Sequence, residues 1–265
     1  MLDSIRKAFG FRFPRLGSLG FRLFSRFCPK QIDTEIVPGI RTTLDLTDAA
    51  QRTVYWQGIR YERATRRRLL DVCARADAFF DVGANFGFFS YVMLSHYPQL
   101  RVYAFEPNPG LFDAMAKTKS RNRLDSFHPI HAGLGREAGE LPLHVSRGNS
   151  GHSTFGPHPD FVNSRTQQPP LSVPVIAFDE WCRKEGLPVA EKPIWIAKVD
   201  AEGYELDVLS GMSESLDARR FACICVELNR FTLSFCGHQP DQVINLMSGF
   251  GYGCYDREGR ELRAD

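Results

Sequence analysis

Two acidic residues and two glycines stand at informative positions in residues 78–108, AFFDVGANFGFFSYVMLSHYPQLRVYAFEPN. Asp81 lies near the end of a short apolar run, and Glu106 ends a second one about 25 residues later. An acid at that separation, at the end of a second strand, accepts hydrogen bonds from both hydroxyls of a ribose. Gly83 and Gly87 allow a tight turn that a ligand can approach closely. These residue types therefore suit a ligand that contains a nucleoside.

The turn between the two acids does not match a phosphate-binding loop. A dinucleotide site needs G-x-G-x-x-G, whereas here Asn85 replaces the middle glycine and the spacing is G-x-x-x-G. The sequence also contains no G-x-x-x-x-G-K-[ST] run for a triphosphate. The carboxylate of Asp81 would repel an anion and attract an ammonium group. S-Adenosylmethionine carries an amino group and a sulfonium but no phosphate, so this combination favours it as the ligand.

A βαβ unit is expected to position these residues. The apolar run at residues 79–82 predicts a buried strand, residues 88–97 have apolar residues at helical spacing before Pro98, and residues 102–105 predict a second strand. Such a crossover is right-handed and places its ligand at the carboxyl ends of the strands. Residues 28–60 are expected to form short extended pieces, among them strands at residues 34–37 and 41–46. Further strands are expected at residues 126–132, 141–145, 171–176, 194–200, 222–228 and 252–255, and further helices at residues 62–74, 111–119, 204–209 and 241–247.

Three motifs follow one another along the chain, DVGANFGFFS, AFEPNP and WIAKVDAEGYELDVLSG. In this order and spacing they resemble the FkbM family of S-adenosylmethionine-dependent methyltransferases, many of which act on hydroxyl groups of sugars and related compounds. The resemblance begins near residues 58–62 and runs to about Asn229. It implies an α/β fold of the Rossmann-like class I methyltransferase type, with a mostly parallel sheet of about seven strands and helices on both faces.

The resemblance also extends the expected donor site. The run at residues 131–135, HAGLG, resembles the family's short segment beside the adenine, where small residues leave room for a flat ring. The motifs and the resemblance together predict a cofactor site made of Asp81, Gly83, Ala84, Asn85, Gly87, Glu106, Asn108, Ala132 and Gly133.

A second group of charged residues lies in and after residues 194–203, IWIAKVDAEG. Lys198 and Asp200 point to the same side of a strand, and Glu202 lies in the turn that follows it. Glu227 stands near the end of another expected strand. These four catalytic candidates can act as a base, hold the donor's amino group or form a salt bridge. A divalent metal held by Asp200, Glu202 and Glu227 is a competing alternative for the three carboxylates.

His152 lies in a long irregular stretch, residues 146–170, and such stretches inside compact domains are usually functional or disordered. The polar run at residues 149–154, NSGHST, is similar to a small N-S-G patch in the family. A sugar hydroxyl has a high pKa and benefits from a general base, a role that histidine suits near neutral pH. His152 is therefore the predicted base, with a solvated loop histidine as the alternative.

The chain divides into a basic, aromatic arm at residues 1–30, cap elements at 31–77 and a methyltransferase domain at 78–265 with the loop insertion at about 146–170. The arm contains seven Arg or Lys residues and one acid, Asp3, whereas the remainder contains 26 basic and 30 acidic residues. The arm either lies on an anionic membrane surface or a partner, or is a poorly ordered leader or folds on the body. The second interpretation is slightly favoured because Pro14 and three glycines interrupt any long helix.

Composition narrows the compartment and the class of partner. The mildly acidic body argues against a broad nucleic-acid surface. Seven scattered cysteines, with neither a C-x-x-C pair nor zinc spacing, indicate thiols in a reducing cytosol. The sequence contains no signal-peptide apolar region and no run of roughly 18 to 20 apolar residues. We therefore expect a cytoplasmic protein, with peripheral membrane contact through the arm as an alternative.

Three classes of function remain open. The expected one is O-methylation of a hydroxyl in a sugar, a glycan or a related small molecule. The alternatives are an RNA 2′-O-methyltransferase, because Lys198, Asp200 and Glu227 resemble a Lys-Asp-Glu catalytic set, and an inactive donor-binding interaction protein. Acceptor pockets are built from loops that carry no general code, so neither the acceptor hydroxyl nor the oligomeric state is predicted.

Overall fold

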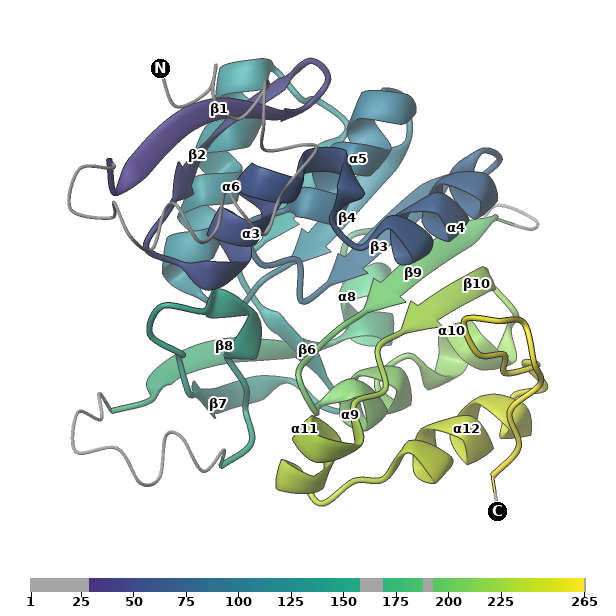
Figure 1. Cartoon of the computed structure of the whole chain (residues 1–265). Helices are drawn as coiled ribbons and strands as arrows, with labels where there is room; N and C mark the ends of the chain where they lie inside the picture. Colours follow the sequence, from purple (N-terminus) through teal and green to yellow (C-terminus); the bar gives the residue numbers. More distant parts are fainter. Residues whose placement is uncertain (1–28, 158–168, 188–192, 265) are drawn as a thin grey trace.

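A sheet of five parallel strands forms the centre of the molecule (Figure 1). The computed structural model describes residues 29–157, 169–187 and 193–264. The strands lie in the order β10-β9-β3-β4-β5, and all pairs in this sheet are parallel. Their bounds are Phe221–Val226 (β10), Trp195–Val199 (β9), Ala78–Val82 (β3), Arg101–Phe105 (β4) and Phe127–Ile130 (β5). The middle strand β3 is buried at every residue, as is usual for a parallel sheet covered on both faces.

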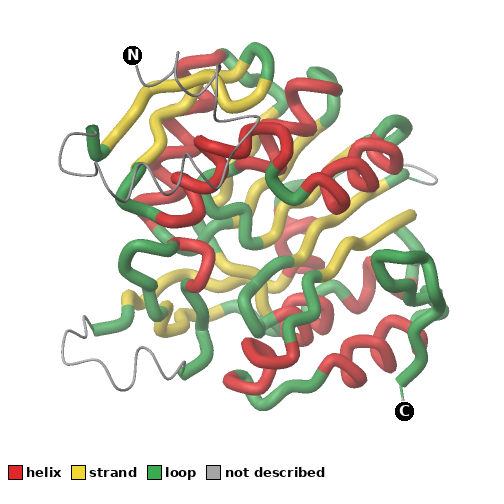
Figure 2. Tube along the Cα trace, in the orientation of Figure 1, coloured by secondary structure: helices red, strands yellow, loops and turns green. Residues whose placement is uncertain are grey.

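The strands send alternate side chains into two hydrophobic cores. Phe79 and Ile196 belong to one core, whereas Phe80 and Ala197 belong to the other, because neighbours in a strand point to opposite faces. The first core is covered by α4 (Arg63–Cys73), α5 (Phe88–His96) and α6 (Pro109–Asn122), and the second by α8 (Phe178–Lys184), α9 (Glu205–Ser210), α10 (Ser213–Asp217) and α12 (Pro240–Gly249). The expected α/β fold with helices on both faces is confirmed (Figures 1 and 2).

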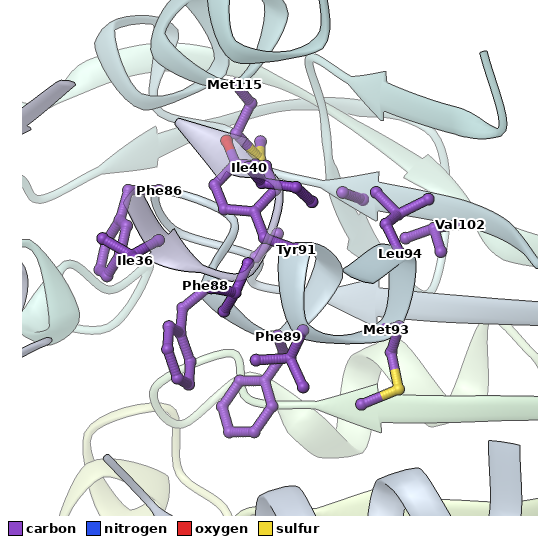
Figure 3. Packing of buried hydrophobic residues seen from close by; sticks show 14 of the residues in the cluster. Ile36, Ile40, Phe86, Phe88, Phe89, Tyr91, Met93, Leu94, Val102 and Met115 are labelled. Atoms are coloured by element: carbon purple, nitrogen blue, oxygen red, sulfur yellow. The ribbon is translucent and has the colours of Figure 1, made fainter. Parts of the chain in front are cut away.

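Helix α5, which follows the glycine turn, is buried along most of its length (Figure 3). Its apolar residues are not confined to one stripe, which is typical of a helix inside a core. Tyr91 is fully buried near Met115 of α6. Ile36 and Ile40, which precede the sheet in the sequence, belong to the same hydrophobic core. The helix is thus enclosed between the sheet and the N-terminal hairpin, and this packing fixes the turn at its start.

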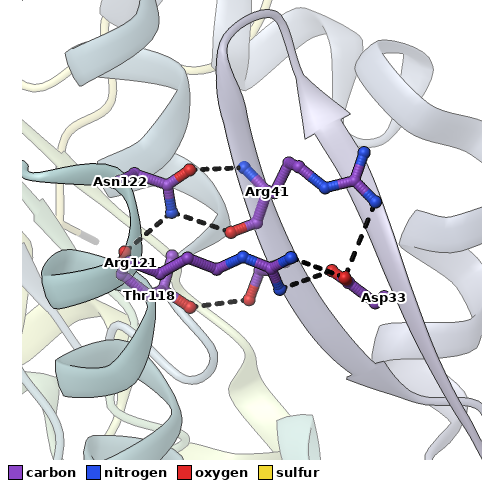
Figure 4. Close-up of polar contacts among 6 residues, drawn as sticks. Asp33, Arg41, Thr118, Arg121 and Asn122 are labelled. Atoms are coloured by element: carbon purple, nitrogen blue, oxygen red, sulfur yellow. Dashed lines mark hydrogen bonds and ion pairs between the residues drawn. The ribbon is translucent and has the colours of Figure 1, made fainter.

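The N-terminal hairpin consists of two antiparallel strands, β1 (Gln31–Val37) and β2 (Ile40–Asp45). Polar contacts join it to α6 (Figure 4). Arg121 donates to both carboxylate oxygens of Asp33 at 2.6 Å, and the side chain of Asn122 bonds the backbone N and O of Arg41 at 2.9 and 2.8 Å. The two-point geometry of both pairs holds the hairpin in one position on the helix.

The predicted count of about seven strands in one sheet is wrong. Strand β8 (Leu171–Ala177) pairs with β6 (Gly133–Gly135) and β7 (Gly139–Leu143) in a separate sheet of order β6-β8-β7. The predicted last strand, residues 252–255, forms only the isolated bridge between Tyr255 and Glu261. The sheet that a strand joins depends on backbone pairing between distant segments. A short apolar run in the sequence does not specify the strand with which it pairs.

The segment before the first core strand also differs from expectation. Residues 49–60 were predicted as extended pieces, but they form α3 (Ala49–Gln57) and a 3-10 turn, η3 (Gly58–Arg60). Asp48 caps α3, since its Oδ1 accepts a hydrogen bond from the backbone N of Gln51 at 2.9 Å. Two short elements remain: η4 (Ser150–His152) and α11 (Arg230–Phe235).

Parts of two predicted segments lie outside the described residues. These parts are residues 1–28 of the basic arm and residues 158–168 of the loop insertion. Among the residues that are described, no helix combines the length and the apolar character needed to cross a membrane.

Candidate active site

A cavity of about 340 Å³ opens at the carboxyl ends of β3, β4, β9 and β10. This is the place where open α/β sheets bind ligands, and the volume lies in the usual range for small-molecule sites. The predicted site residues that line the cavity are Gly83, Ala84, Asn85, Glu106, Gly133, His152, Lys198, Asp200, Glu202 and Glu227. We call the part formed by Asn85, Glu106 and Gly133 the Glu106 end, and the part formed by Glu62, Lys198, Asp200, Glu202 and Glu227 the acidic end.

The turn after β3 joins the two ends. Gly83 has a φ of 74°, and a Cβ at this position would collide with the backbone oxygen of Asp200. The backbone N of Gly83 bonds the oxygen of Phe105 at 3.1 Å, and the N of Asp200 bonds the oxygen of Val82 at 3.1 Å. The ends of three strands are therefore locked together, and the lack of a side chain at Gly83 permits it.

Glu106 is 6% exposed and is held by two backbone amides. Its Oε2 accepts from the N of Asn85 at 2.8 Å, and its Oε1 accepts from the N of Asn108 at 2.8 Å. Burial raises the pKa of Glu106 to about 7, although the two amides oppose that rise. Each oxygen keeps a lone pair for one more donor. The two remaining acceptor positions fit the expectation that Glu106 receives the two hydroxyls of a ribose in S-adenosylmethionine.

Asp81 does not line the cavity. It is 1% exposed, and its Oδ2 accepts hydrogen bonds from the backbone N of Ser90 at 3.0 Å and from its hydroxyl at 2.7 Å. Burial raises its pKa, and the positive charge of Lys198 opposes this. The structure therefore places Asp81 beneath the cavity floor, where it supports α5 and the buried lysine.

Three other residues of the predicted cofactor site also lie outside the cavity lining. Gly87 has a φ of 89°, and a Cβ there would lie 2.8 Å from the ring of Tyr91, so this glycine serves helix packing. Asn108 caps α6 by accepting from the N of Gly110 at 3.0 Å, and Ala132 is buried. The backbone of Asn108 still acts on the site, because its N–H orients Glu106.

Lys198 and Asp200 meet at the acidic end. Lys198 is 4% exposed, and its Nζ lies 2.7 Å from Oδ2 of Asp200 and 4.9 Å from the ring centre of Phe89. Burial lowers the pKa of Lys198, but the charges of Asp200 and Asp81 outweigh this, so its pKa lies above the usual value. Lys198 is thus a permanent ammonium near neutral pH and cannot accept a proton there.

Glu202 and Glu227 share this end of the cavity. Burial, followed by the charges of Asp200 and Glu227, raises the pKa of Glu202 to about 8. The charge of Asp200, followed by burial, raises the pKa of Glu227. Glu205 is different, because it holds the turn by accepting hydrogen bonds from the N of Ala201 at 2.9 Å and from the N of Gly203. The acidic end therefore gathers four acidic side chains around one lysine, and the Glu202 carboxyl is mostly protonated near neutral pH.

The described residues contain no group of three or more His, Cys, Asp and Glu side chains arranged to hold a metal ion. Asp200, Glu202 and Glu227 nevertheless line the same cavity. What their arrangement offers is a set of hydrogen-bond acceptors and a field that favours positive charge.

Tyr61 and Glu62 line the cavity but were not assigned to the site from the sequence. The ring of Tyr61 packs edge-on against Phe88 at 5.2 Å, and Glu62 has a left-handed backbone with a φ of 41°. Burial and the charge of Glu62 raise the pKa of Tyr61. Their segment marks the start of the family resemblance, which was the one signal that pointed to them.

The described part of the loop insertion carries His152 to the cavity. The backbone N of Ser150 bonds Oδ2 of Asp48 at 2.5 Å, and the Ser150 hydroxyl bonds Oδ1 of Asn85 at 3.0 Å. Thr154 donates its hydroxyl to the backbone oxygen of Glu202 at 2.7 Å. The segment around His152 therefore bridges α3, the Glu106 end and the acidic end. The contribution of α3 was missed, because that helix was predicted as extended chain.

This geometry agrees with what the sequence matches. Residues 81–254 match the family model of the methyltransferase FkbM domain. The chain belongs to the FkbM methyltransferase family. The expectation of an enzyme that uses S-adenosylmethionine is thereby confirmed.

The chain is similar in sequence to several named methyltransferases. The hexuronic acid methyltransferase AglP of Haloferax volcanii is 28% identical over 72% of this chain and 69% of its own length. Methyltransferase sdnD of Sordaria araneosa is 31% identical over 51% of this chain and 60% of its own length. The 2-O-methyltransferase NoeI of Sinorhizobium fredii is 24% identical over 58% of this chain and 65% of its own length. The alignments thus span 60 to 69% of these relatives.

Proposed function

We propose that this FkbM methyltransferase transfers a methyl group to a hydroxyl of a sugar or glycan whose reacting unit carries no negative charge. The acidic end carries the proposal: Glu62, Asp200, Glu202 and Glu227 surround the cavity, with Lys198 already paired to Asp200. Carboxylates accept hydrogen bonds from hydroxyl groups and repel another carboxylate. The printed names of AglP and NoeI support an acceptor of the sugar class. AglP is named for a hexuronic acid, so a charged sugar is the competing acceptor that the panel below tests.

The reaction divides the work between the two ends. S-Adenosylmethionine supplies an electrophilic methyl group on a sulfonium. Glu106 holds the ribose hydroxyls, and the negative field of the acidic end favours the cationic side of the donor. Asp200, Glu202 and Glu227 accept hydrogen bonds from neighbouring acceptor hydroxyls and so orient the reacting oxygen. Holding both reactants at about 3 to 3.5 Å in line supplies much of the rate enhancement.

His152 is the proposed general base. The acceptor hydroxyl oxygen forms a bond to the methyl carbon while the carbon–sulfur bond breaks. The proton of that hydroxyl passes to the imidazole of His152. His152→Ala is expected to lower kcat by roughly a hundredfold or more, with donor affinity unchanged, which single-turnover rates and calorimetry would measure. An exposed histidine outside the cavity lining, His96, provides the matched His96→Ala control. Normal turnover by His152→Ala, or activity that a chelator abolishes and a divalent ion restores, would move the proton-accepting role to the carboxylates.

The decisive experiment is a panel of acceptors scored by release of S-adenosylhomocysteine. The panel contains neutral glycosides, the matching uronic acids and short RNA. We expect product with neutral glycosides, because a uronate or a phosphodiester would meet the carboxylates of the acidic end. Product with RNA alone would favour the alternative Lys198, Asp200 and Glu227 set, and donor binding without any product would favour an interaction protein.

A further inference from the structure

A second hollow, of about 440 Å³, runs along the outer edge of β10. We call it the edge groove. Its lining residues come from α4, β10, α12 and the C-terminal segment at residues 252–257. Arg68 joins α4 to the C-terminal segment, because its guanidinium donates to the backbone oxygens of Asp256 and Arg257. The groove is therefore a built channel rather than a gap between loosely placed elements.

The lining of the edge groove is mainly apolar. It includes Leu69, Val72, Ile224, Ile244, Met247 and Tyr255. Val72 is 36% exposed and Tyr255 is 63% exposed, although both are large hydrophobic residues. An exposed apolar lining of this kind is typical of a groove that binds an apolar group of a ligand or partner.

The edge groove borders the acidic end of the active-site cavity. Glu62, Lys198 and Glu227 line both hollows. Glu62 precedes the first residue of α4, and Glu227 follows the last residue of β10. The groove therefore begins beside the residues that we propose to hold the acceptor hydroxyls.

The groove is long enough for an extended chain. From Glu62 to Val72 helix α4 runs about 15 Å at 1.5 Å per residue. From Glu227 back to Ala222 strand β10 runs about 16 Å at 3.3 Å per residue. Both walls thus lead away from the reacting end over the same length, and Val72 and Ala222 mark the far end.

We infer that the acceptor is an amphiphile, in which a neutral sugar carries an apolar tail and the tail occupies the edge groove. The inference rests on the proposed function and adds the class of molecule attached to the sugar. The shared rim identifies the occupant, because Glu62 and Glu227 border both the proposed sugar site and the apolar lining of the edge groove.

The test uses the full chain and glycosides of one neutral sugar with methyl, butyl, octyl and dodecyl tails, below the concentrations at which they form micelles. We expect kcat/KM to rise with tail length, by up to about fourfold for each methylene that the groove buries fully. Val72→Asp places a charge at the far end of the groove. It should lower kcat/KM for the octyl and dodecyl glycosides at least tenfold and leave the methyl and butyl glycosides unchanged.

Leu171→Asp is the matched control, because Leu171 is 41% exposed and lines neither hollow. Equal kcat/KM for all tail lengths in the wild type would overturn the inference and leave the proposed function standing. Absence of product with every glycoside would instead contradict the proposed function. In that case calorimetry with the dodecyl glycoside decides the inference: binding that Val72→Asp abolishes supports it, and no binding overturns it. A concentration-dependent dimer that Val72→Asp dissociates would assign the groove to a second copy of the chain and also overturn it.

Discussion

The two ends of the active-site cavity satisfy their carboxylates in opposite ways. At the Glu106 end, one buried carboxylate receives two backbone amides at 2.8 Å, so the fold itself orients it. At the acidic end, several carboxylates share one lysine and raise one another's pKa. A carboxylate that the backbone holds in one orientation suits a partner of fixed shape, whereas a cluster of acidic side chains can accept hydrogen bonds from several hydroxyls. The contrast suggests that the first end is built for the invariable donor and the second for a polyhydroxylated acceptor.

Removing the lysine tests this contrast most strongly. Lys198→Met leaves the buried Asp81 and the partly exposed Asp200 without their positive neighbour. We expect the free energy of unfolding to fall by about 3 to 5 kcal/mol, because breaking a buried pair strands its charge. Urea denaturation measures this change. Arg121→Met, which removes the exposed pair with Asp33, should change stability far less. Equal effects of the two substitutions would mean that the acidic end is not held by its ion pair.

The sequence predicts those parts of this arrangement in which the contacting residues are close together in the chain. The βαβ unit and the place of Glu106 are local, because a strand, a glycine turn and a helix follow one another within residues 78–108. The side to which Asp81 points was not predictable in the same way. One residue of register decides whether an acid faces the ligand or the helix, and here Ser90 takes its carboxylate.

Residues from distant segments were harder to assign. Tyr61 and Glu62 line the cavity where Tyr61 packs on Phe88, a contact between distinct elements. The separate three-stranded sheet depends on pairing between β6 and β8, which are far apart in the sequence. The helix α3 had a local signal, the cap Asp48, but the alternating pattern before it favoured extended chain.

Glu106→Ala sharpens the comparison from the donor side. It leaves the amides of Asn85 and Asn108 without their acceptor and removes the expected bonds to the ribose. We expect a loss of about 2 to 3 kcal/mol of binding free energy, or about 30- to 150-fold in the Kd for S-adenosylmethionine. Calorimetry measures it, with the exposed Glu140→Ala as control. Unchanged affinity would remove Glu106 from the donor site.

The acidic end also predicts a pH dependence of stability. The pKa of Glu202 is about 8 in the folded protein and about 4.5 without the fold. The folded state therefore binds more protons between these values, and stability falls as pH rises from about 4.5 to about 8. Glu202→Gln should make this fall shallower, as thermal unfolding at several pH values would show. An identical pH profile in the variant would mean that Glu202 ionises as freely in the folded protein as in solution.

The central claim is that the charge of the acidic end selects a neutral acceptor. The most direct measurement compares kcat/KM for a neutral glycoside and its uronic acid, in the wild type and in Glu227→Gln. Glu227 lies at the rim, so the substitution removes one charge with little change of shape. We expect the wild type to prefer the neutral glycoside and Glu227→Gln to reduce that preference several-fold. A wild-type preference for the uronic acid, or a preference that Glu227→Gln leaves unchanged, would contradict the account.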